Sequence, residues 1–586
     1  MGAAADSDRK PRAMTAASPA SSSSARPGAR YPAPRSRMGF LGALTICVIA
    51  LVALPVAGLV YFALQGSGDL WPHLIRNVIP VAVRTSVLLL LGVGAMVACI
   101  GVGAAWLIAN FRFPGRRILE WALLLPLAVP SYIVAYAYLD VMHPVGPVQS
   151  TIRAILGITN PRDLWFPEIR SLGGAIVLLG FVLYPYVYLP VRALFMMQSP
   201  TVIEVARTLG AGPARSFFSV ALPLARPAIA VGTSLALMEA LNDIGASEFL
   251  GVRTLTVAIY TTWVTRSSIE GAAQIALLML TIVLLLIFVE HAARERQRFV
   301  GRAGRQHQIV PADLHGWRGL LATAACALPV FLGFGIPASY LVYAAWHRFT
   351  EFGLPADLGI WIGNTMAAAV AATVVTIVLG LVLGYAQRFS RSPNARTFVR
   401  LAGIGYTIPG TVLAVGLLVP LASFDNVVAD FFRDHFDIRT GLILSGSGGA
   451  LVLAYVIRFL AISFGSIEAG LAKVSPSLDM AARCLGGGHF RLLTRIHAPM
   501  LAPAITAAAL LVFVDCMKEL PITLLLRPFN FETLATYVYG EAARGTYEDG
   551  AIAALTIVIV GMIPIIFLAR SSFRDSRQGA SSRSGR

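Results

Sequence analysis

Four acidic residues interrupt apolar stretches of this sequence and are its first candidates for chemistry. Glu239 and Asp243 are four residues apart, and Asp515 and Glu519 repeat that spacing 276 residues further along the chain. Residues four apart share one face of a helix, so each pair would present two carboxylates side by side. Lys518 is the only basic residue within these two stretches and could neutralise one of the charges.

Two interpretations of these acids stay open from the sequence. Charges within membrane spans are costly and usually face the interior of a helix bundle, so the acids could form a gate or a cation-facing lining between two halves. They could equally form internal ion pairs and caps that hold broken helices. Glu239 follows Ala228 by eleven residues, which is roughly 16 Å along a helix and near the middle of a bilayer. Their sign suits a metal cation but identifies no metal and no ligand set.

A polar segment recurs at the same spacing of 276 residues. Glu204-Val-Ala-Arg-Thr-Leu-Gly210-Ala-Gly212 aligns with Met480-Ala-Ala-Arg-Cys-Leu-Gly486-Gly-Gly488, and the alignment continues without a gap to Pro223 and Pro499. We expect each copy to form a short helix that ends at its glycines, then a turn, a second short helix and the proline before the next span. Two copies at one register indicate that the chain contains two parallel repeats.

The elements that position these residues must lie in a membrane. Of the 586 residues, 56% are hydrophobic and only 13% are charged, where a soluble domain has about 25%. The net charge of +17 is typical of basic segments that set membrane orientation, which makes nucleic acid an unsuitable partner. The five cysteines form no CxxC pair and predict neither disulfides nor a zinc site.

The hydropathy predicts twelve membrane-spanning helices, six in each half, and therefore an all-α polytopic membrane protein. We expect the spans near 38–64, 85–109, 118–142, 173–196, 228–250, 271–292, 319–345, 364–386, 398–422, 448–469, 504–526 and 551–569. The connecting segments alternate between Arg-rich ones and others such as the acidic segment 423–446. This bias predicts that both termini are cytoplasmic.

The same pattern divides the chain into five parts. They are a disordered basic cytoplasmic tail (1–37), a first permease domain (38–292), a cytoplasmic linker (293–318), a second permease domain (319–570) and a second basic tail (571–586).

The repeated segment resembles the EAA signature of importer permeases, whose short coupling helix seats in a cleft of a separate ATPase subunit. The resemblance implies coupling roles for Glu204, Ala206, Gly210, Gly212 and Pro223 in the first copy, and for Asp479, Ala481, Ala482, Gly486 and Pro499 in the second. Met480 stands where the signature has glutamate. The second site therefore lacks its acidic contact unless the neighbouring Asp479 replaces it.

The chain from about 38 to 570 is similar to the ferric-iron importer permeases, which fuse two permease domains. The similarity rests on stretches such as Tyr184-Pro-Tyr-Val-Tyr188, Tyr406-Thr-Ile-Pro-Gly410, Arg458-Phe-Leu and Lys518-Glu-Leu-Pro521. It implies the MetI-like importer-permease fold and iron(III) as cargo. Permeases for thiamine, polyamines and phosphonates are related, so another cargo stays an alternative.

The resemblance also implies the partners of the chain. They are two copies of an ABC ATPase subunit, a periplasmic or extracellular substrate-binding protein and the lipid bilayer of the cell inner membrane. The sequence has no G-x-x-x-x-G-K-[ST] motif, so we expect a transport subunit without enzymatic activity and without a cofactor, with ATP bound by the partners. Less favoured alternatives are an ion-driven secondary transporter, which would not need the repeated segment, and a scaffold protein, which would not need the acids.

Overall fold

The computed structural model describes residues 40–197, 210, 212–295, 312–389, 405, 408–486 and 488–581. Regular structure in these residues is helical except for two short parallel strands, β1 (Phe111–Arg112) and β2 (Ala312–Asp313). The predicted tail 1–37 and residues 296–311 of the predicted linker lie outside the described residues. The all-α fold class predicted from the sequence is confirmed.

The helices of the first half are α1 (Phe40–Gln65), α2 (Leu70–His73), α3 (Ile79–Asn110), α4 (Arg116–Ala122), α5 (Ser131–Val141), α6 (Pro147–Leu156), α7 (Leu172–Leu183), α8 (Pro185–Met197), α10 (Pro213–Ser216), α11 (Leu222–Asn242), α12 (Gly245–Phe249), α13 (Leu255–Val264) and α14 (Ile269–Glu295). Short 3-10 or π turns are η1 (Leu74–Val78), η2 (Leu125–Ala128), η3 (Pro161–Asp163) and η4 (Phe217–Ala221).

The helices of the second half are α15 (Gly316–Val330), α16 (Ile336–Phe352), α17 (Leu358–Phe389), α19 (Gly410–Phe436), α20 (Gly449–Ala472), α21 (Pro476–Cys484), α22 (His489–Leu492), α23 (Ala498–Met517), α24 (Pro521–Leu526), α25 (Leu534–Arg544) and α26 (Tyr547–Ser581). The π turns η5 (Phe331–Gly335) and η7 (Leu493–His497) lie between helices of this half.

Ten of the described helical stretches are long and apolar enough to span a bilayer, or up to twelve if each of two bent pairs is one span. The larger bend, 92°, lies between the α4–η2 segment and α5. It has a local cause, because a residue that precedes proline disfavours the helical region, and Val129 before Pro130 is extended. Every one of the twelve predicted spans overlaps one of these stretches.

Two predicted spans have the wrong boundaries. The helices around α11 and α23 begin at Phe217 and Leu493, about eleven residues before the predicted starts, and end at Asn242 and Met517 instead of continuing to 250 and 526. Pro223 and Pro499 therefore lie inside continuous helices. Each helix accommodates its proline through a π turn directly before it, where the Leu222 amide donates to the Phe217 carbonyl five residues back.

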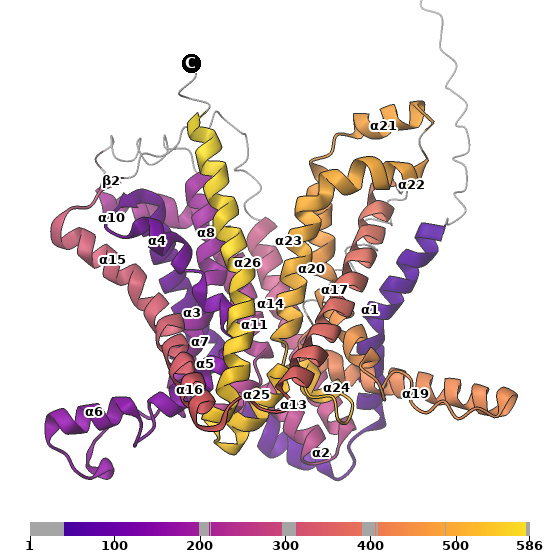
Figure 1. Ribbon diagram of the computed structural model, residues 1–586, viewed down its shortest axis with the longest axis horizontal. Helices are drawn as coiled ribbons and strands as arrows, with labels where there is room; N and C mark the ends of the chain where they lie inside the picture. The colour runs from indigo at the N-terminus through magenta and orange to yellow at the C-terminus, as the bar shows by residue number, and fades with distance from the viewer. Residues whose placement is uncertain are drawn as a thin grey trace, which may run out of the picture.

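The acidic segment 423–446 is also partly different from the prediction. We expected a loop after the ninth span, but α19 continues as a helix to Phe436. In Figure 1 this part of α19 extends sideways from the bundle, as α6 does on the other side. The helix α26 likewise continues beyond the predicted end of the twelfth span, to Ser581.

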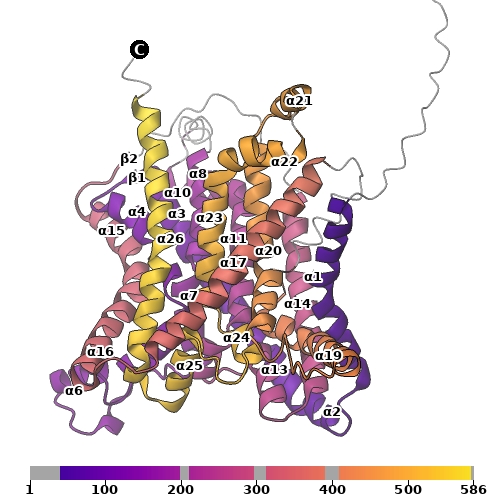
Figure 2. The same ribbon diagram turned by 45° about the vertical axis from the view of Figure 1, so that its right-hand side comes forward.

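The first long helix of each half packs against the opposite half (Figure 1, Figure 2). Helix α1 crosses α19 so closely that a Cβ on Gly58 would lie 2.1 Å from the carbonyl oxygen of Gly416. Between α15 and α16, a Cβ on Gly333 would lie 2.3 Å from the carbonyl oxygen of Phe181 in α7. Small residues allow such close helix crossings in membranes, so the two halves interlock through their first helices.

Functional segments gather at two ends of the bundle. Helices α10, α21 and α22 and the C-terminal end of α26 lie at one end, and α13, α24 and α25 lie at the other (Figure 1). Helices α11 and α23 connect the two levels.

Candidate functional site

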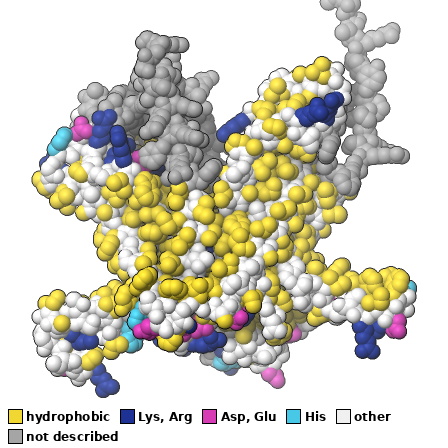
Figure 3. Space-filling view, in the orientation of Figure 1, with side chains coloured by type: hydrophobic (Ala, Val, Ile, Leu, Met, Phe, Trp, Pro, Cys, Tyr) yellow, Lys and Arg dark blue, Asp and Glu magenta, His cyan; other side chains and the backbone are white. Residues whose placement is uncertain are grey.

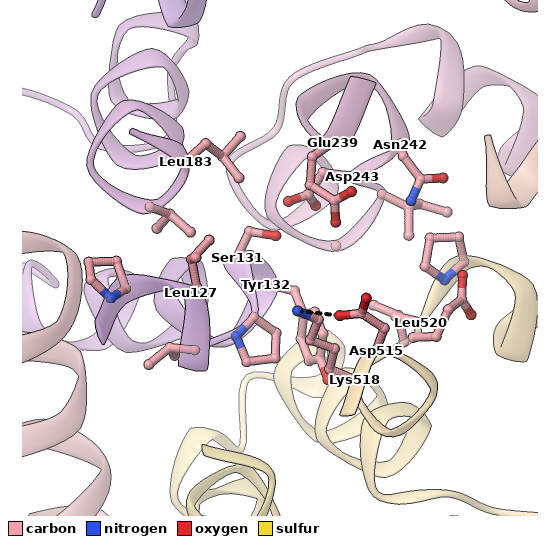
Figure 4. Close-up of a pocket in the computed structure, with 18 of the residues that line it drawn as sticks. Leu127, Ser131, Tyr132, Leu183, Glu239, Asn242, Asp243, Asp515, Lys518 and Leu520 are labelled. Atoms are coloured by element: carbon pink, nitrogen blue, oxygen red, sulfur yellow. Dashed lines mark ion pairs between the residues drawn. The ribbon is translucent and has the colours of Figure 1, made fainter. Parts of the chain in front are cut away.

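A cavity of about 90 Å³ lies where the two halves meet. It has room for only a few water molecules, so the surrounding side chains form a constriction in this conformation. Its charged lining residues are Glu239, Asp243, Arg458, Asp515, Lys518 and Glu519. All five pathway residues predicted from the sequence thus line one cavity, and Figure 4 shows most of them converging on it from both halves.

The prediction that the two acids of each pair lie on one face of a continuous helix is wrong. Helix α11 ends at Asn242, and Asp243 has an extended backbone with φ −74° and ψ 110°. Helix α23 also ends before Glu519, at Met517. Glu239 consequently lies in the last turn of a helix that begins at Phe217, so the depth estimated from Ala228 does not apply.

The second acid of each pair caps the helix that follows the break. Asp243 Oδ1 accepts a hydrogen bond of 2.8 Å from the Ala246 amide at the start of α12. Glu519 accepts hydrogen bonds of 3.0 to 3.2 Å from the Ile522 and Thr523 amides at the start of α24. Such bonds satisfy amides that have no partner within a helix. The interpretation as caps therefore holds for Asp243 and Glu519.

The first acid of each pair has no such role. Asp515 is 2.9 Å from the Lys518 ammonium, and both side chains are about three-quarters buried. Within the described residues, Glu239 forms no salt bridge, and it points into the cavity from the opposite half (Figure 4). Glu239 thus fits the interpretation as a cavity lining, whereas Asp515 lines the cavity and also forms an internal ion pair.

Two cavity residues were missed in the sequence analysis. Arg458 of α20 lies 3.8 Å from Glu519, and its Nη1 also donates to Asn242 Oδ1 at 3.2 Å. The same Asn242 oxygen accepts from the Gly410 amide at the start of α19. Arg458 could have been found, because an arginine within an apolar span carries the same signal as the acids.

The acidic residues do not form a chelating cluster in this conformation. Among the described residues, no group of three or more His, Cys, Asp or Glu side chains is placed to hold a metal ion. The cavity can therefore attract a cation through its charge, but it holds no resident metal site of that kind in the described part of the chain.

The coupling segments are only partly described. Glu204 and Ala206 lie outside the described residues. Gly210 and Gly486 have φ of +84° and +76°, a left-handed conformation that glycine adopts without strain, and Gly486 follows α21 as a helix-ending residue. Gly212 precedes α10 and is exposed. The expected helix with a glycine end is thus present in the second copy.

Asp479 of α21 points into the protein and not toward solvent. Its carboxylate accepts hydrogen bonds of 2.8 Å from Arg388 Nε on α17 and from His497 Nε2 on η7. The other ring nitrogen of His497 bonds the Tyr385 hydroxyl. Burial raises the pKa of Asp479, but the bonds from Arg388 and His497 outweigh it and hold the pKa below its ordinary value.

The exposed surface of α21 is different. Met480 is 62% exposed and Ala481 is exposed, while Ala482 is half-buried. Because Asp479 is engaged internally, the described conformation does not present it as a replacement for the missing glutamate. We call Asp479, His497, Arg388 and Tyr385 the α21 anchor.

The π turn recurs at the same register in both halves. Residues of η4 and η7 differ by 276 in number, and Pro223 and Pro499 follow each turn by the same distance. The second short helix of each coupling segment, α10 or α22, is therefore joined without a break to a helix, α11 or α23, that ends at the cavity. Movement of one end can be transmitted to the other along a helix of about 26 residues, roughly 39 Å.

Two parallel helical repeats, a polar cavity between them and a repeated polar segment at one end define a polytopic membrane transport subunit. Comparison with known proteins identifies its family. Residues 98–298 match the family described as "Binding-protein-dependent transport system inner membrane component". The molybdenum transport system permease protein ModB of Escherichia coli is 32% identical over 209 residues, which are 34% of this chain and 88% of that protein. The chain belongs to this permease family.

Two further relatives cover most of the chain. It is 24% identical over 492 residues to the Fe(3+)-transport system permease protein FbpB 2 of Haemophilus influenzae, covering 82% of this chain and 89% of that protein. It is also 24% identical over 501 residues to the probable ABC transporter permease protein y4fN of Sinorhizobium fredii, covering 81% and 84%. The resemblance to importer permeases noted from the sequence is confirmed at the level of the family.

Proposed function

We propose that this chain is the membrane-spanning permease of an ATP-driven importer that moves iron(III) delivered by a substrate-binding protein. In this proposal two copies of a separate ATPase subunit bind the two coupling segments, one beneath each repeat. The ATP is bound by those subunits, and this chain contributes neither a cofactor nor catalysis.

The observation that carries the proposal is the continuity between coupling segment and cavity in both repeats. Helix α11 extends from the first segment to Glu239, and α23 extends from the second segment to Asp515. If the ATPase subunits move the two segments, both acid-bearing helix ends must respond. Each coupling segment and its helix would then form a two-state element, and nucleotide binding would bias its equilibrium.

The charge of the cavity supports a cationic cargo. Four carboxylates face two basic groups there, so the lining favours cations over oxyanions such as molybdate or sulfate. The relatives that cover most of the chain include one named for Fe(3+) transport. Thiamine and polyamines are also cations, so they remain alternative cargoes. Phosphonate is an anion, which the negative charge of the cavity disfavours.

We further propose that Lys518 closes the cavity in the absence of cargo. Its ammonium neutralises Asp515 and lies across the cavity from Glu239 (Figure 4). An arriving cation competes with this tethered one for the same carboxylates. Removal of the Lys518 charge should therefore let small cations enter the constriction.

We propose that the protein lies in the inner membrane, with both termini and both coupling segments in the cytoplasm. The shared end of α10, α21 and the α26 C-terminus supports this orientation (Figure 1). A cysteine-reactive, membrane-impermeant reagent applied to intact cells tests it, with exposed loop positions at both ends as targets. Labelling of the end that carries α21 from outside would refute the orientation.

The test of function is reconstitution. The permease, its ATPase subunits and its binding protein are assembled in liposomes, and uptake of radioactive iron(III) is compared with uptake of thiamine, spermidine, phosphonate and molybdate. We expect iron(III) uptake that requires ATP and the binding protein. Uptake driven by an ion gradient without ATP would indicate a secondary transporter, and ATP-driven uptake of another compound would leave the importer class intact while refuting the cargo.

A further inference from the structure

Two amphipathic helices extend sideways from the bundle at the end opposite α21 and the α26 C-terminus. We call them arms: the first is α6 (Pro147–Leu156), and the second is residues 424–436 of α19. Figure 1 and Figure 2 place both arms at the same level, across the direction of the spanning helices.

The second arm separates apolar and polar residues with helical periodicity. Phe424, Val427, Val428 and Phe431 repeat at spacings of three and four, and Phe424, Val427 and Phe431 are each at least half exposed. The charged and polar residues Asn426, Asp430 and Arg433 lie away from this stripe, whereas Asp434 borders it beside Val427. An exposed apolar stripe of this size is not expected to face water.

The first arm has the same division in a shorter helix. Val148, Ile152, Ile155 and Leu156 form one face, and Ile155 and Leu156 are mostly exposed. Ser150 and Arg153 lie on the other side.

The two arms occupy equivalent positions in the repeats. Helix α5, which leads to the first arm, begins after Pro130 with φ −57° and ψ 142°, and α19 begins after Pro409 with φ −57° and ψ 144°. Both starting points border the cavity between the halves, since Ser131 lines it and the Gly410 amide bonds Asn242. The arms thus arise twice, from different sequences, at one place in the fold.

The orientation of the faces identifies what covers them. In Figure 3 the yellow side of the α19 arm faces the level of the spanning helices, and its blue and magenta side faces away from them. A soluble partner approaching that end would meet the charged side. The apolar side continues the hydrophobic lateral surface of the bundle, where the lipid lies.

We propose that both arms lie in the interfacial layer of the bilayer leaflet opposite the coupling segments, with their apolar faces inserted among the lipid chains. The expected occupant is the lipid surface itself, which binds helices that have one apolar and one charged face. Because α5 and α19 start at the cavity, the arms fix the position of those helices relative to the membrane.

Depth-dependent fluorescence quenching tests the proposal. Single cysteines at Val427 and Phe431, and at Arg433 as the matched control on the same helix, are labelled with a small fluorophore in a cysteine-free chain that still assembles with its ATPase. The permease is reconstituted in phosphatidylcholine–phosphatidylglycerol nanodiscs that carry a nitroxide near the head group. We expect at least threefold stronger quenching at positions 427 and 431 than at 433, and the same contrast between Ile155 and Ser150.

A second measurement avoids the cysteine-free chain. In the otherwise native protein, Val427→Asp with Phe431→Asp should raise amide hydrogen exchange in 424–436 at least tenfold in nanodiscs, while Arg433→Asp should not. Equal lipid quenching on the two faces of the arm would overturn the proposal. Protection of position 427 that arises only when the binding protein is added would also overturn it, in favour of a protein docking surface.

Discussion

The substitution Asp479→Asn isolates the α21 anchor. It preserves the size of the side chain but removes the negative charge that Arg388 and His497 share. His497 is fully buried and cannot turn to water for a new partner. Arg388 keeps its bonds to the carbonyl oxygens of Leu471 and Val474, so the damage should stay local.

The size of the effect follows from the two lost interactions. Hydrogen bonds to charged groups contribute about 1.5–3 kcal/mol each, and breaking a buried ion pair costs about 3–5 kcal/mol. The amide still accepts one hydrogen bond, so we expect a loss near 3 kcal/mol. Since about 1.4 kcal/mol is a factor of ten, α21 should detach from α17 and η7 roughly a hundredfold more often.

Hydrogen exchange of residues 476–484 measures this detachment directly, in the permease with and without its ATPase subunits. We expect faster exchange in Asp479→Asn and a loss of transport-coupled ATP hydrolysis, because α21 would no longer move α23 with it. Met480→Ala on the exposed side of α21 is the matched control and should leave the exchange of residues 476–484 unchanged. Less than threefold change in exchange in Asp479→Asn, or an equal change in the control, would refute the role of the anchor.

Three further predictions concern the coupling segments and the cavity. Glu204→Ala should reduce coupled ATP hydrolysis more than Met480→Ala, and equal losses would contradict unequal docking sites. Glu239→Gln combined with Asp515→Asn should abolish uptake while assembly and ATP hydrolysis persist. Asp243→Asn combined with Glu519→Gln should instead impair assembly, because Asp243 and Glu519 cap helices. Lys518→Met should produce an ATP-independent leak of small cations, measured as dissipation of a potassium gradient in liposomes, and Asn242→Met should not; a tight membrane in Lys518→Met would refute its closing role.

Hydropathy was sufficient to predict where helices cross the membrane but not where they break. The predicted fifth and eleventh spans continued past Asp243 and Glu519, because the flanking residues are as apolar as a span. The breaks depend on side-chain carboxylates that cap α12 and α24, and apolar periodicity does not record such bonds. The end of α19 was missed for the opposite reason, since its charges resemble those of a loop.

The contacts between the repeats could not be predicted from the sequence. The crossing of α1 and α19 depends on Gly58 and Gly416, since a Cβ on Gly58 would lie 2.1 Å from the carbonyl oxygen of Gly416, and glycine occurs at many other positions of the spans. The pairing of Arg458 with Glu519 also joins residues from different helices. In contrast, the offset of 276 residues predicted which positions of the two halves are equivalent, because two aligned segments are enough to establish that offset.

The two repeats differ in the basic residues that they place at the cavity. At the cavity, the second half has Lys518 and Arg458 where the first half has Asn242 and Val182 at the same register. A permease made of two identical chains would have to carry its bases at equivalent positions in both halves. Fusion of the repeats permits both bases to lie in one half, with two acids in each half, which leaves the cavity negative but partly neutralised by its own cations. The second repeat thus supplies both bases of the cavity, while the first supplies Glu239, a carboxylate that forms no salt bridge within the described residues.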